Sequence, residues 1–375
     1  MSELYEFELL TSEDSERTVQ AYIVAYFMFQ MGEGKTFHKK RIYVEKTLST
    51  PMGNKSPDIH LKNSNDDTSL WLELKVYIEN GPNINDKGLN KDFESLKTST
   101  KNKVLTVVFD RPEKMNTFSG QMLKDILELL DESEKDDDIR AVIFTGSGKA
   151  FCAGADLSSG EDTFDMSEKG KSKAEVKRDT GGILTLRLFD FKKPLIAAIN
   201  GAAVGVGVTM TLPMDVRICS DKAKFGFVFA KRGIVPEACS SWFLPKIVGI
   251  SNALQWCLSG KIFMPQEALD KGLVTEVTSE DKLLERAEEI AADFVEATSS
   301  LSVTLIRQML WKMLGADHPM EAHKIDSRGV YSLGKTGEAS EGVMSFLEKR
   351  EPNFPGKVSK DLPEFYPWWE DKEFK

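Results

Sequence analysis

The stretch KPLIAAINGAAVGVGVTM, from Lys193 to Met210, decides the fold of this chain. Its apolar run Leu195 to Ile199 is closed by the turn pair Asn200-Gly201, which predicts a short buried strand. Three glycines then stand at the entrance of an apolar helix, where free N–H groups and the positive end of the helix dipole suit an oxyanion. Although Leu195 to Met214 carries no charge, the turn and the glycines predict strand, turn and helix rather than a membrane span.

A second glycine-rich stretch, GKAFCAGADL from Gly148 to Leu157, follows the predicted buried strand Ala141 to Thr145. Its small side chains would let a ligand approach the backbone closely. Each stretch taken alone is also typical of an ordinary tight turn between a strand and a helix. Neither is specific for a function without the other.

Around these stretches the chain alternates between predicted strands and helices. A hairpin is predicted from Phe93 to Thr98 and Val104 to Phe109, and the acidic run Glu132 to Asp138 is interpreted as a solvated loop. We expect an α/β fold whose βα units stack on a largely parallel sheet, with a core over residues 91–278. Residues 279–375 are predicted to be helical, because apolar residues recur there at helical spacing.

The first 90 residues are predicted to form a separate small α+β segment. An amphipathic helix is expected from Val19 to Gln30, then strands at Arg41 to Glu45 and Ser69 to Ile78, and the Gly-, Pro- and Asn-rich run Glu79 to Asp92 predicts the domain boundary. Pro57-Asp58 and Glu73-Leu74-Lys75 weakly resemble the PD-(D/E)xK nuclease pattern, whose carboxylates hold Mg²⁺. Metal-dependent nuclease activity of this segment is therefore one open hypothesis, and the sequence assigns it no other role.

Composition excludes several classes of function. The 375 residues carry a formal net charge of -10, which argues against a general nucleic-acid or anionic-membrane binder. The four cysteines are scattered without CxxC pairing, so neither a disulfide framework nor a zinc site is indicated, and His318 and His323 lack a metal-ligand pattern. The N-terminus does not have the pattern of an export signal. We expect a cytoplasmic protein without a metal site.

Five segments together resemble the crotonase superfamily, also called the enoyl-CoA hydratase and isomerase family. They are Asp110 to Ser119, Ala141 to Leu157, Lys193 to Met210, Lys224 to Gly249, and a tail from His318 onward. The resemblance implies a spiral of ββα units closed by C-terminal helices that form homotrimers or hexamers. It implies an acyl-CoA thioester as substrate, with coenzyme A as part of the substrate and no separate cofactor.

The resemblance also assigns roles to individual residues. The backbone N–H groups of Ala155 and Val206 would form an oxyanion hole around the thioester carbonyl, and Lys114 would lie near the CoA phosphates. The other residues expected to line the substrate are Ala153, Asp156, Leu157 and Gly205, together with Thr209 and Phe229 discussed next.

The acid and base depart from the hydratase pattern. Hydratases of the family carry two glutamates, and the matching positions here are Thr209 and Phe229, neither of which can act as a carboxylate base. Glu237, in Val235-Pro236-Glu237-Ala238-Cys239-Ser240-Ser241, resembles the PEGCSS element of Δ3,Δ2-enoyl-CoA isomerases. Its apolar sequence neighbours predict a raised pKa.

Isomerisation with Glu237 as the single proton shuttle is thus the leading hypothesis for the activity. Enoyl-CoA hydration or dehydration is the alternative within the enzyme class. A catalytically silent acyl-CoA-binding scaffold is the alternative outside it.

Overall fold

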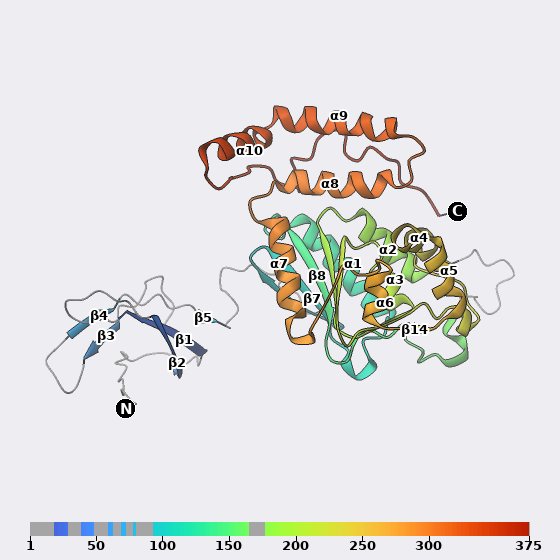
Figure 1. The fold of residues 1–375 in the computed structure, drawn as a ribbon, viewed down its shortest axis with the longest axis horizontal. Coiled ribbons are helices and arrows are strands. Elements are labelled where there is room, and N and C mark those ends of the chain that lie inside the picture. The colour runs from blue at the N-terminus through green and yellow to red at the C-terminus, as the bar shows by residue number, and fades with distance from the viewer. Residues whose placement is uncertain are drawn as a thin grey trace. The chain divides into compact units, whose positions relative to one another are not determined.

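The computed structural model describes residues 93–164 and 177–374 and, as backbone, five strands between residues 19 and 79. The chain divides into two units, Met1–Asp86 and Lys87–Lys375. This division lies inside the run Glu79 to Asp92. Figure 1 draws both units.

The described residues of the first unit are all in strands. β1 (Val19–Met28) pairs antiparallel with β2 (Lys39–Leu48) over ten residues and with β5 (Ile78–Glu79), while β3 (Ile59–Lys62) pairs with β4 (Ser69–Leu72). The helix expected from Val19 to Gln30 is wrong. Its β-branched and aromatic residues favour a strand once a partner is present. Asp58, Glu73 and Lys75 lie outside the described residues, so the nuclease hypothesis stays untested.

A six-stranded sheet in the order β15-β12-β10-β8-β7-β6 forms the centre of the second unit. β6 (Leu96–Lys101) and β7 (Val104–Phe109) form a hairpin with positive φ at Asn102 and Lys103, and every other neighbouring pair is parallel. The largely parallel sheet expected from the sequence is confirmed. The remaining strands are β8 (Ala141–Gly146), β10 (Leu195–Ile199), β12 (Val216–Ser220) and β15 (Glu276–Thr278).

The second unit also contains a smaller, four-stranded sheet in the order β14-β13-β11-β9. β8, β10 and β12 each continue through a short turn into one of its parallel strands, namely β9 (Ala150–Cys152), β11 (Ala202–Val204) and β13 (Lys224–Gly226). β14 (Ile262–Phe263) closes the edge antiparallel to β13. A helix comes after each pair of strands, so the repeated ββα unit is confirmed.

Helices cover both faces of the large sheet (Figure 1). On one face, Val142 and Phe144 of β8 join a core that includes α1 (Gly120–Lys135) and α2 (Thr180–Asp190). On the other face, Ala141 and Ile143 pack with α7 (Leu283–Val295). The strand residues are therefore buried on both sides, as in other parallel sheets. The other helices here are α3 (Val206–Thr209), α4 (Ser240–Val248), α5 (Ile250–Ser259) and α6 (Pro265–Asp270).

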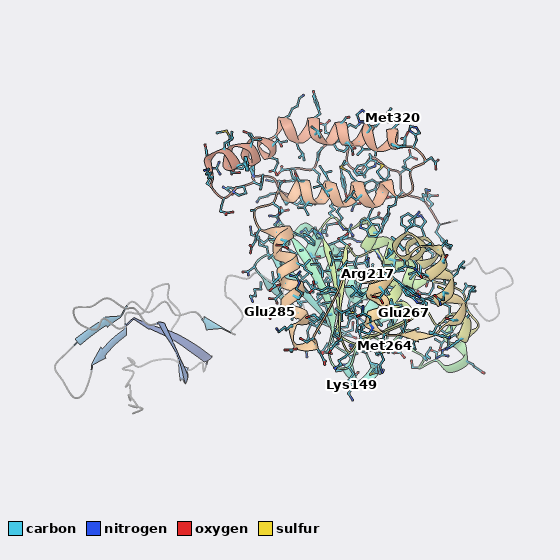
Figure 2. All side chains as sticks on the ribbon, in the orientation of Figure 1. Lys149, Arg217, Met264, Glu267, Glu285 and Met320 are labelled. Carbon is cyan, nitrogen blue, oxygen red and sulfur yellow. The ribbon has the colours of Figure 1, made fainter. Side chains whose placement is uncertain are left out.

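Arg217 fixes the segment behind the four-residue helix α3. The residue lies in the interior of the unit (Figure 2) and is 7% exposed. It donates hydrogen bonds to the carbonyl oxygens of Thr211, Met214 and Leu273. These bonds tie the turn after α3 to the sheet, so the short helix has a rigid base.

The chain ends in three helices, α8 (Ser300–Met313), α9 (Pro319–Lys335) and α10 (Gly337–Glu348), as expected for this region. Buried Arg307 joins α8 to the core through Asp215 and four carbonyl oxygens. Glu338 of α10 accepts hydrogen bonds from the Ser299 hydroxyl and from the N–H of Gly356 in the tail. In the part of the chain that the structure describes, no helix is long and apolar enough to cross a membrane.

Candidate active site

Two glycine-rich stretches meet beyond the ends of β9 and β11. These strands are parallel with Cys152 opposite Ala203. Ala155 and Val206 each follow their paired residue by three positions, so the register brings both to the same end of the small sheet. The Asn200 side chain also ties the turns before the two strands together, since it accepts from Gly146 N–H and donates to the Gly148 carbonyl.

Close packing of the two stretches requires glycine at two positions. A Cβ built on Gly207 of α3 would overlap the carbonyl oxygen of Cys152, and Gly154 adopts φ +118°, where side chains are strained. Gly205, which precedes α3, has φ +54°. The glycines singled out in the sequence thus allow α3 to lie directly against β9.

In the described part of the chain, the amides of Ala155 and Val206 have no protein acceptor. Ala155 forms a parallel bridge with Phe118, in which Phe118 N–H donates to Gly154 and Asp156 N–H donates to Phe118. The N–H of Ala155 itself therefore points to the opposite side. Val206 is the first residue of α3, where the N–H has no intrahelical partner. Within residues 93–164 and 177–374, neither N–H donates to an acceptor.

Glu237 lies beside α3, the helix that begins with Val206. The Thr209 hydroxyl of α3 donates to Glu237 Oε1 at 2.6 Å. Oε2 lies against Gly181 of α2, because a Cβ built on Gly181 would overlap this oxygen and would be 3.3 Å from Cγ2 of Val206. Burial raises the pKa of Glu237 to about 7; the Thr209 hydrogen bond opposes this effect and the negative charge of Asp179 adds to it. The carboxyl group can therefore take up and release a proton near neutral pH.

The loop that carries Glu237 is held from both sides. Ala238 and Cys239 both have φ of 54°, a left-handed conformation that is uncommon for residues with a side chain. Ala238 N–H donates to Asp179 Oδ2 at 2.7 Å, and both the N–H and the hydroxyl of Ser240 donate to the Glu237 carbonyl. These contacts fix the backbone from which the carboxylate projects.

The other predicted substrate residues fall into two groups. Ala153, Asp156 and Leu157 follow β9 and form one edge of the candidate site, which is called the rim below. Leu157 is 53% exposed, and Asp156 forms an ion pair with Arg111. Lys114 is exposed nearby. The pKa of Asp156 is lowered by hydrogen bonds from Ser158, then by Arg111 and by the charge of Lys114.

Thr209 and Phe229 do not reach this rim. Thr209 is fully buried and contacts Glu237 instead, while Phe229 is 2% exposed and packs in the core with Phe227. Three residues that the sequence reasoning missed are Arg111, Asp179 and Gly181. Asp179 before the run Thr180-Gly181-Gly182 was recognisable as a helix N-cap, and the structure confirms this cap.

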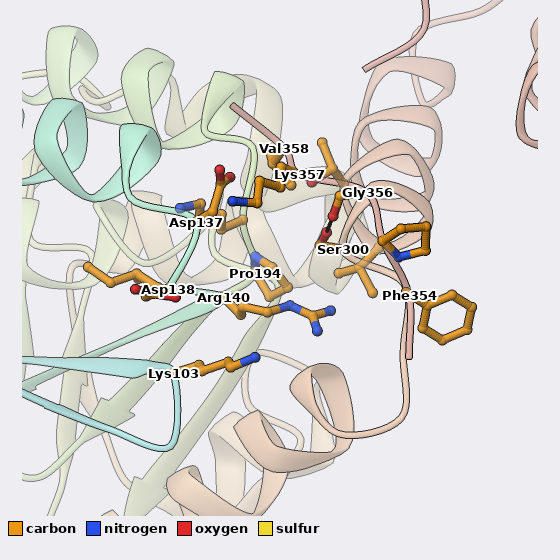
Figure 3. Close-up of a pocket in the computed structure, with 15 residues that line it drawn as sticks. Lys103, Asp137, Asp138, Arg140, Pro194, Ser300, Phe354, Gly356, Lys357 and Val358 are labelled. Atoms are coloured by element: carbon orange, nitrogen blue, oxygen red, sulfur yellow. Dashed lines mark hydrogen bonds between the residues drawn. The ribbon is translucent and has the colours of Figure 1, made fainter. Parts of the chain in front are cut away.

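A separate cleft of about 190 Å³ lies elsewhere on this unit (Figure 3). Its residues Lys103, Arg140 and Pro194 directly precede β7, β8 and β10, so it opens at the amino ends of the parallel strands. Ala155, Val206 and Glu237 do not line it. Among the described residues, no cluster of His, Cys, Asp and Glu side chains could hold a metal ion.

The ββα spiral with its C-terminal helices defines a crotonase-type α/β fold. Known proteins agree with this assignment. Residues 99–357 match the family described as enoyl-CoA hydratase/isomerase. An enoyl-CoA hydratase from Alternaria alternata, ACTT3, is 39% identical over 252 residues, which are 67% of this chain and 82% of that protein. This chain belongs to the enoyl-CoA hydratase/isomerase family of acyl-CoA enzymes.

Relatives in the family differ in their named reactions. The 1,2-epoxyphenylacetyl-CoA isomerase of Escherichia coli is 32% identical over 68% of this chain and 95% of its own length. Among solved structures, a probable enoyl-CoA hydratase/isomerase from Mycobacterium abscessus superposes with a TM-score of 0.64 and 25% identity, over 70% of this chain and 99% of that one. Family membership alone does not select one reaction.

Proposed function

We propose that this chain is a Δ3,Δ2-enoyl-CoA isomerase with Glu237 as its single proton shuttle. The observation that carries the proposal is a partly buried carboxyl group, with a pKa raised to about 7, that contacts α3. The amide of Val206 at the start of α3, like that of Ala155, has no acceptor in the described part of the chain. The Ala155 and Val206 amides would hold the thioester oxygen. A carboxylate near them would reach the carbon next to that carbonyl.

The reaction needs one base and one charge-stabilising site. Ionised Glu237 removes a proton from C2, the electrons move into a dienolate, and the two amides hold the negative oxygen. Protonated Glu237 then returns the proton to C4, which leaves the double bond between C2 and C3. Because the pKa of Glu237 is close to neutral, both of its forms are available in one catalytic cycle.

Within residues 93–164 and 177–374, the surroundings of Glu237 offer no second free acid. Thr209 and Phe229 stand where hydratases of the family carry glutamates. Asp179, the carboxylate whose charge acts on Glu237, already accepts N–H groups from Gly181, Gly182 and Ala238. Hydration normally requires one group to activate water and another to deliver a proton, so this arrangement favours isomerisation.

Hydration remains the second candidate because the 39% identical relative is named an enoyl-CoA hydratase. The same oxyanion hole would serve either reaction. A chain that bound acyl-CoA without turning over any enoyl-CoA would instead be a binding scaffold.

Coenzyme A would lie along the rim formed by Ala153, Asp156 and Leu157. Exposed Lys114 supplies positive charge there, which suits the CoA phosphates, whereas the charge of Arg111 is balanced by Asp156. We further propose assembly into trimers or hexamers through α9 and α10, since these helices expose large apolar side chains: Val330, Tyr331, Val343, Phe346 and Leu347. The cytoplasmic location expected from the sequence also stays a prediction.

A comparison of two Glu→Gln variants tests the function. Purified wild type and Glu285→Gln should convert 3-enoyl-CoA to 2-enoyl-CoA at equal rates, because Glu285 is exposed on α7 (Figure 2). Glu237→Gln should bind the substrate but lose turnover. Unchanged turnover in Glu237→Gln would refute the role of Glu237, and loss of absorbance from crotonyl-CoA in water would identify a hydratase.

A further inference from the structure

The two oxygens of the Glu237 carboxylate have different surroundings. Oε1 accepts the hydroxyl hydrogen of Thr209 at 2.6 Å, and Thr209 is itself fully buried in α3. Oε2 lies against the bare Cα of Gly181, where a built Cβ would also be 3.3 Å from Cγ2 of Val206. Within residues 93–164 and 177–374, Oε2 is the oxygen of the two that accepts no hydrogen bond.

Asp179 fixes the loop that presents this carboxylate. Its Oδ1 accepts Gly181 N–H at 3.0 Å, while its Oδ2 accepts Gly182 N–H at 2.8 Å and Ala238 N–H at 2.7 Å. One carboxylate thus joins the start of α2 to the residue after Glu237. This connection holds Gly181 and Glu237 next to each other although they are far apart in the sequence.

We propose that Thr209 and Asp179 are positioning residues that make Glu237 a one-oxygen base, in which only Oε2 exchanges the proton with substrate. Thr209 occupies Oε1, and Asp179 holds the loop so that Oε2 faces the acyl chain. The proposal rests on the isomerase function proposed above and names the atom that performs it.

The hydrogen bond from Thr209 can persist in both protonation states. When Glu237 is ionised, Oε1 accepts the hydroxyl hydrogen; when Oε2 gains the substrate proton, Oε1 becomes the carbonyl oxygen and still accepts it. The carboxyl group is thereby prevented from rotating between removal of the proton at C2 and its return at C4. No atom is lost or gained, because the same proton leaves C2 and arrives at C4.

Asp179 is the charged group that faces Glu237 in the described structure. The thiols of Cys152 in β9 and Cys239 at the start of α4 also lie close, but burial raises the pKa of both, to about 12 for Cys152, so they stay neutral near pH 7. Arg178 influences Cys239 and is exposed. The two positioning residues therefore affect the pKa of Glu237 in opposite directions: the Thr209 hydrogen bond lowers it and the Asp179 charge raises it.

The experiment follows the ionisation of Glu237 directly and through activity. Without substrate, the infrared spectrum of wild type contains the band of protonated Glu237, and Glu237→Gln lacks this band. The intensity of the band as a function of pH gives the pKa of Glu237. The pH dependence of kcat/KM for 3-enoyl-CoA reports it during turnover. The variants are Thr209→Val, Thr209→Ser and Asp179→Asn, with Thr211→Val as control, because buried Thr211 donates to the Val208 carbonyl and not to Glu237.

We expect Thr209→Val to move the acid limb to higher pH and to lower kcat on the order of tenfold, as for loss of a hydrogen bond to a charged group. Thr209→Ser should restore both values, Asp179→Asn should move the limb to lower pH, and Thr211→Val should leave it in place. Equal behaviour of Thr209→Val and Thr211→Val would overturn the inference. If Glu237→Gln retained turnover, the proposed function would fall, while the infrared titration would still decide whether Thr209 holds Oε1.

Discussion

Gly181→Ala should inactivate the enzyme without unfolding it. The added methyl group would overlap Oε2 of Glu237 and lie 3.0 Å from Cβ of Ala238. Oε2 is the far end of a flexible side chain, so the carboxylate can move by roughly an ångström, a displacement that can cost about a hundredfold in rate. Alanine also favours the helix by up to about 1 kcal/mol relative to glycine, which offsets part of the crowding.

The assay compares turnover of 3-enoyl-CoA with the free energy of unfolding in urea. We expect kcat to fall about a hundredfold, with a change in unfolding free energy below about 1 kcal/mol. Gly120→Ala is the control, since no atom lies within 4 Å of a Cβ built there at the start of α1; it should keep full activity. Activity of Gly181→Ala within about threefold of wild type would show that Oε2 does not need its present place.

Three further predictions concern stability and assembly. Folding raises the pKa of Glu237 from 4.5 to about 7. The contribution of this group to the free energy of unfolding is therefore complete below the pKa that it has in the unfolded chain, and it is lost as the pH rises through 7. Thermal unfolding should show Glu237→Gln more stable than wild type at about pH 8, by up to about 3 kcal/mol, and as stable as wild type at about pH 4. An unchanged gap between these pH values would contradict the raised pKa. Arg307→Met should lower the unfolding free energy by about 3–5 kcal/mol, because Asp215 and four carbonyl oxygens lose a buried partner; a loss below about 1 kcal/mol in urea would refute this. Phe346→Glu, at a side chain 82% exposed on α10, should shift the protein to smaller species in sedimentation velocity, and an unchanged sedimentation coefficient would exclude Phe346 from the interface.

The buried strands could be predicted well from the sequence. Leu195 to Ile199 is confirmed residue for residue as β10, and Ala141 to Thr145 differs from β8 by one residue. Both lie in a parallel sheet with helices on its two faces, so every residue is apolar or small and the run ends where the turn begins. Local composition alone carries this information.

Elements that depend on a distant partner were predicted less well. The acidic run Glu132 to Asp138 was expected to be loop, but α1 continues to Lys135. Ser133 is buried, and Glu134 forms an ion pair with Arg187 of α2, more than fifty residues later. Charge spacing within the run could not reveal that partner. The error over Val19 to Gln30 has the same cause, because the strand that pairs with β1 begins about twenty residues after the first residue of β1.

The candidate site shows the same division between local and distant information. Ala155, Val206 and Glu237 could be named because each lies in a short motif. Asp179 and Gly181 could not, since their contacts with Ala238 and Glu237 each close a loop of more than fifty residues. The N-cap signal at Asp179 predicts the start of α2 but says nothing of the Ala238 N–H that the same carboxylate accepts.

Residue 209 and Glu237 are physically coupled. The Thr209 hydroxyl lies 2.6 Å from Glu237 Oε1, so a glutamate at position 209, as hydratases of the family carry, would bring a second carboxylate against the first. Two carboxylates so close cannot both be ionised, and one pKa would rise strongly. Together with the charge of Asp179, which already raises the pKa of Glu237, this would leave Glu237 protonated at neutral pH and unable to act as a base. An uncharged hydrogen-bond donor at position 209 therefore favours the proposed role of Glu237 as a base, which a glutamate at that position would oppose.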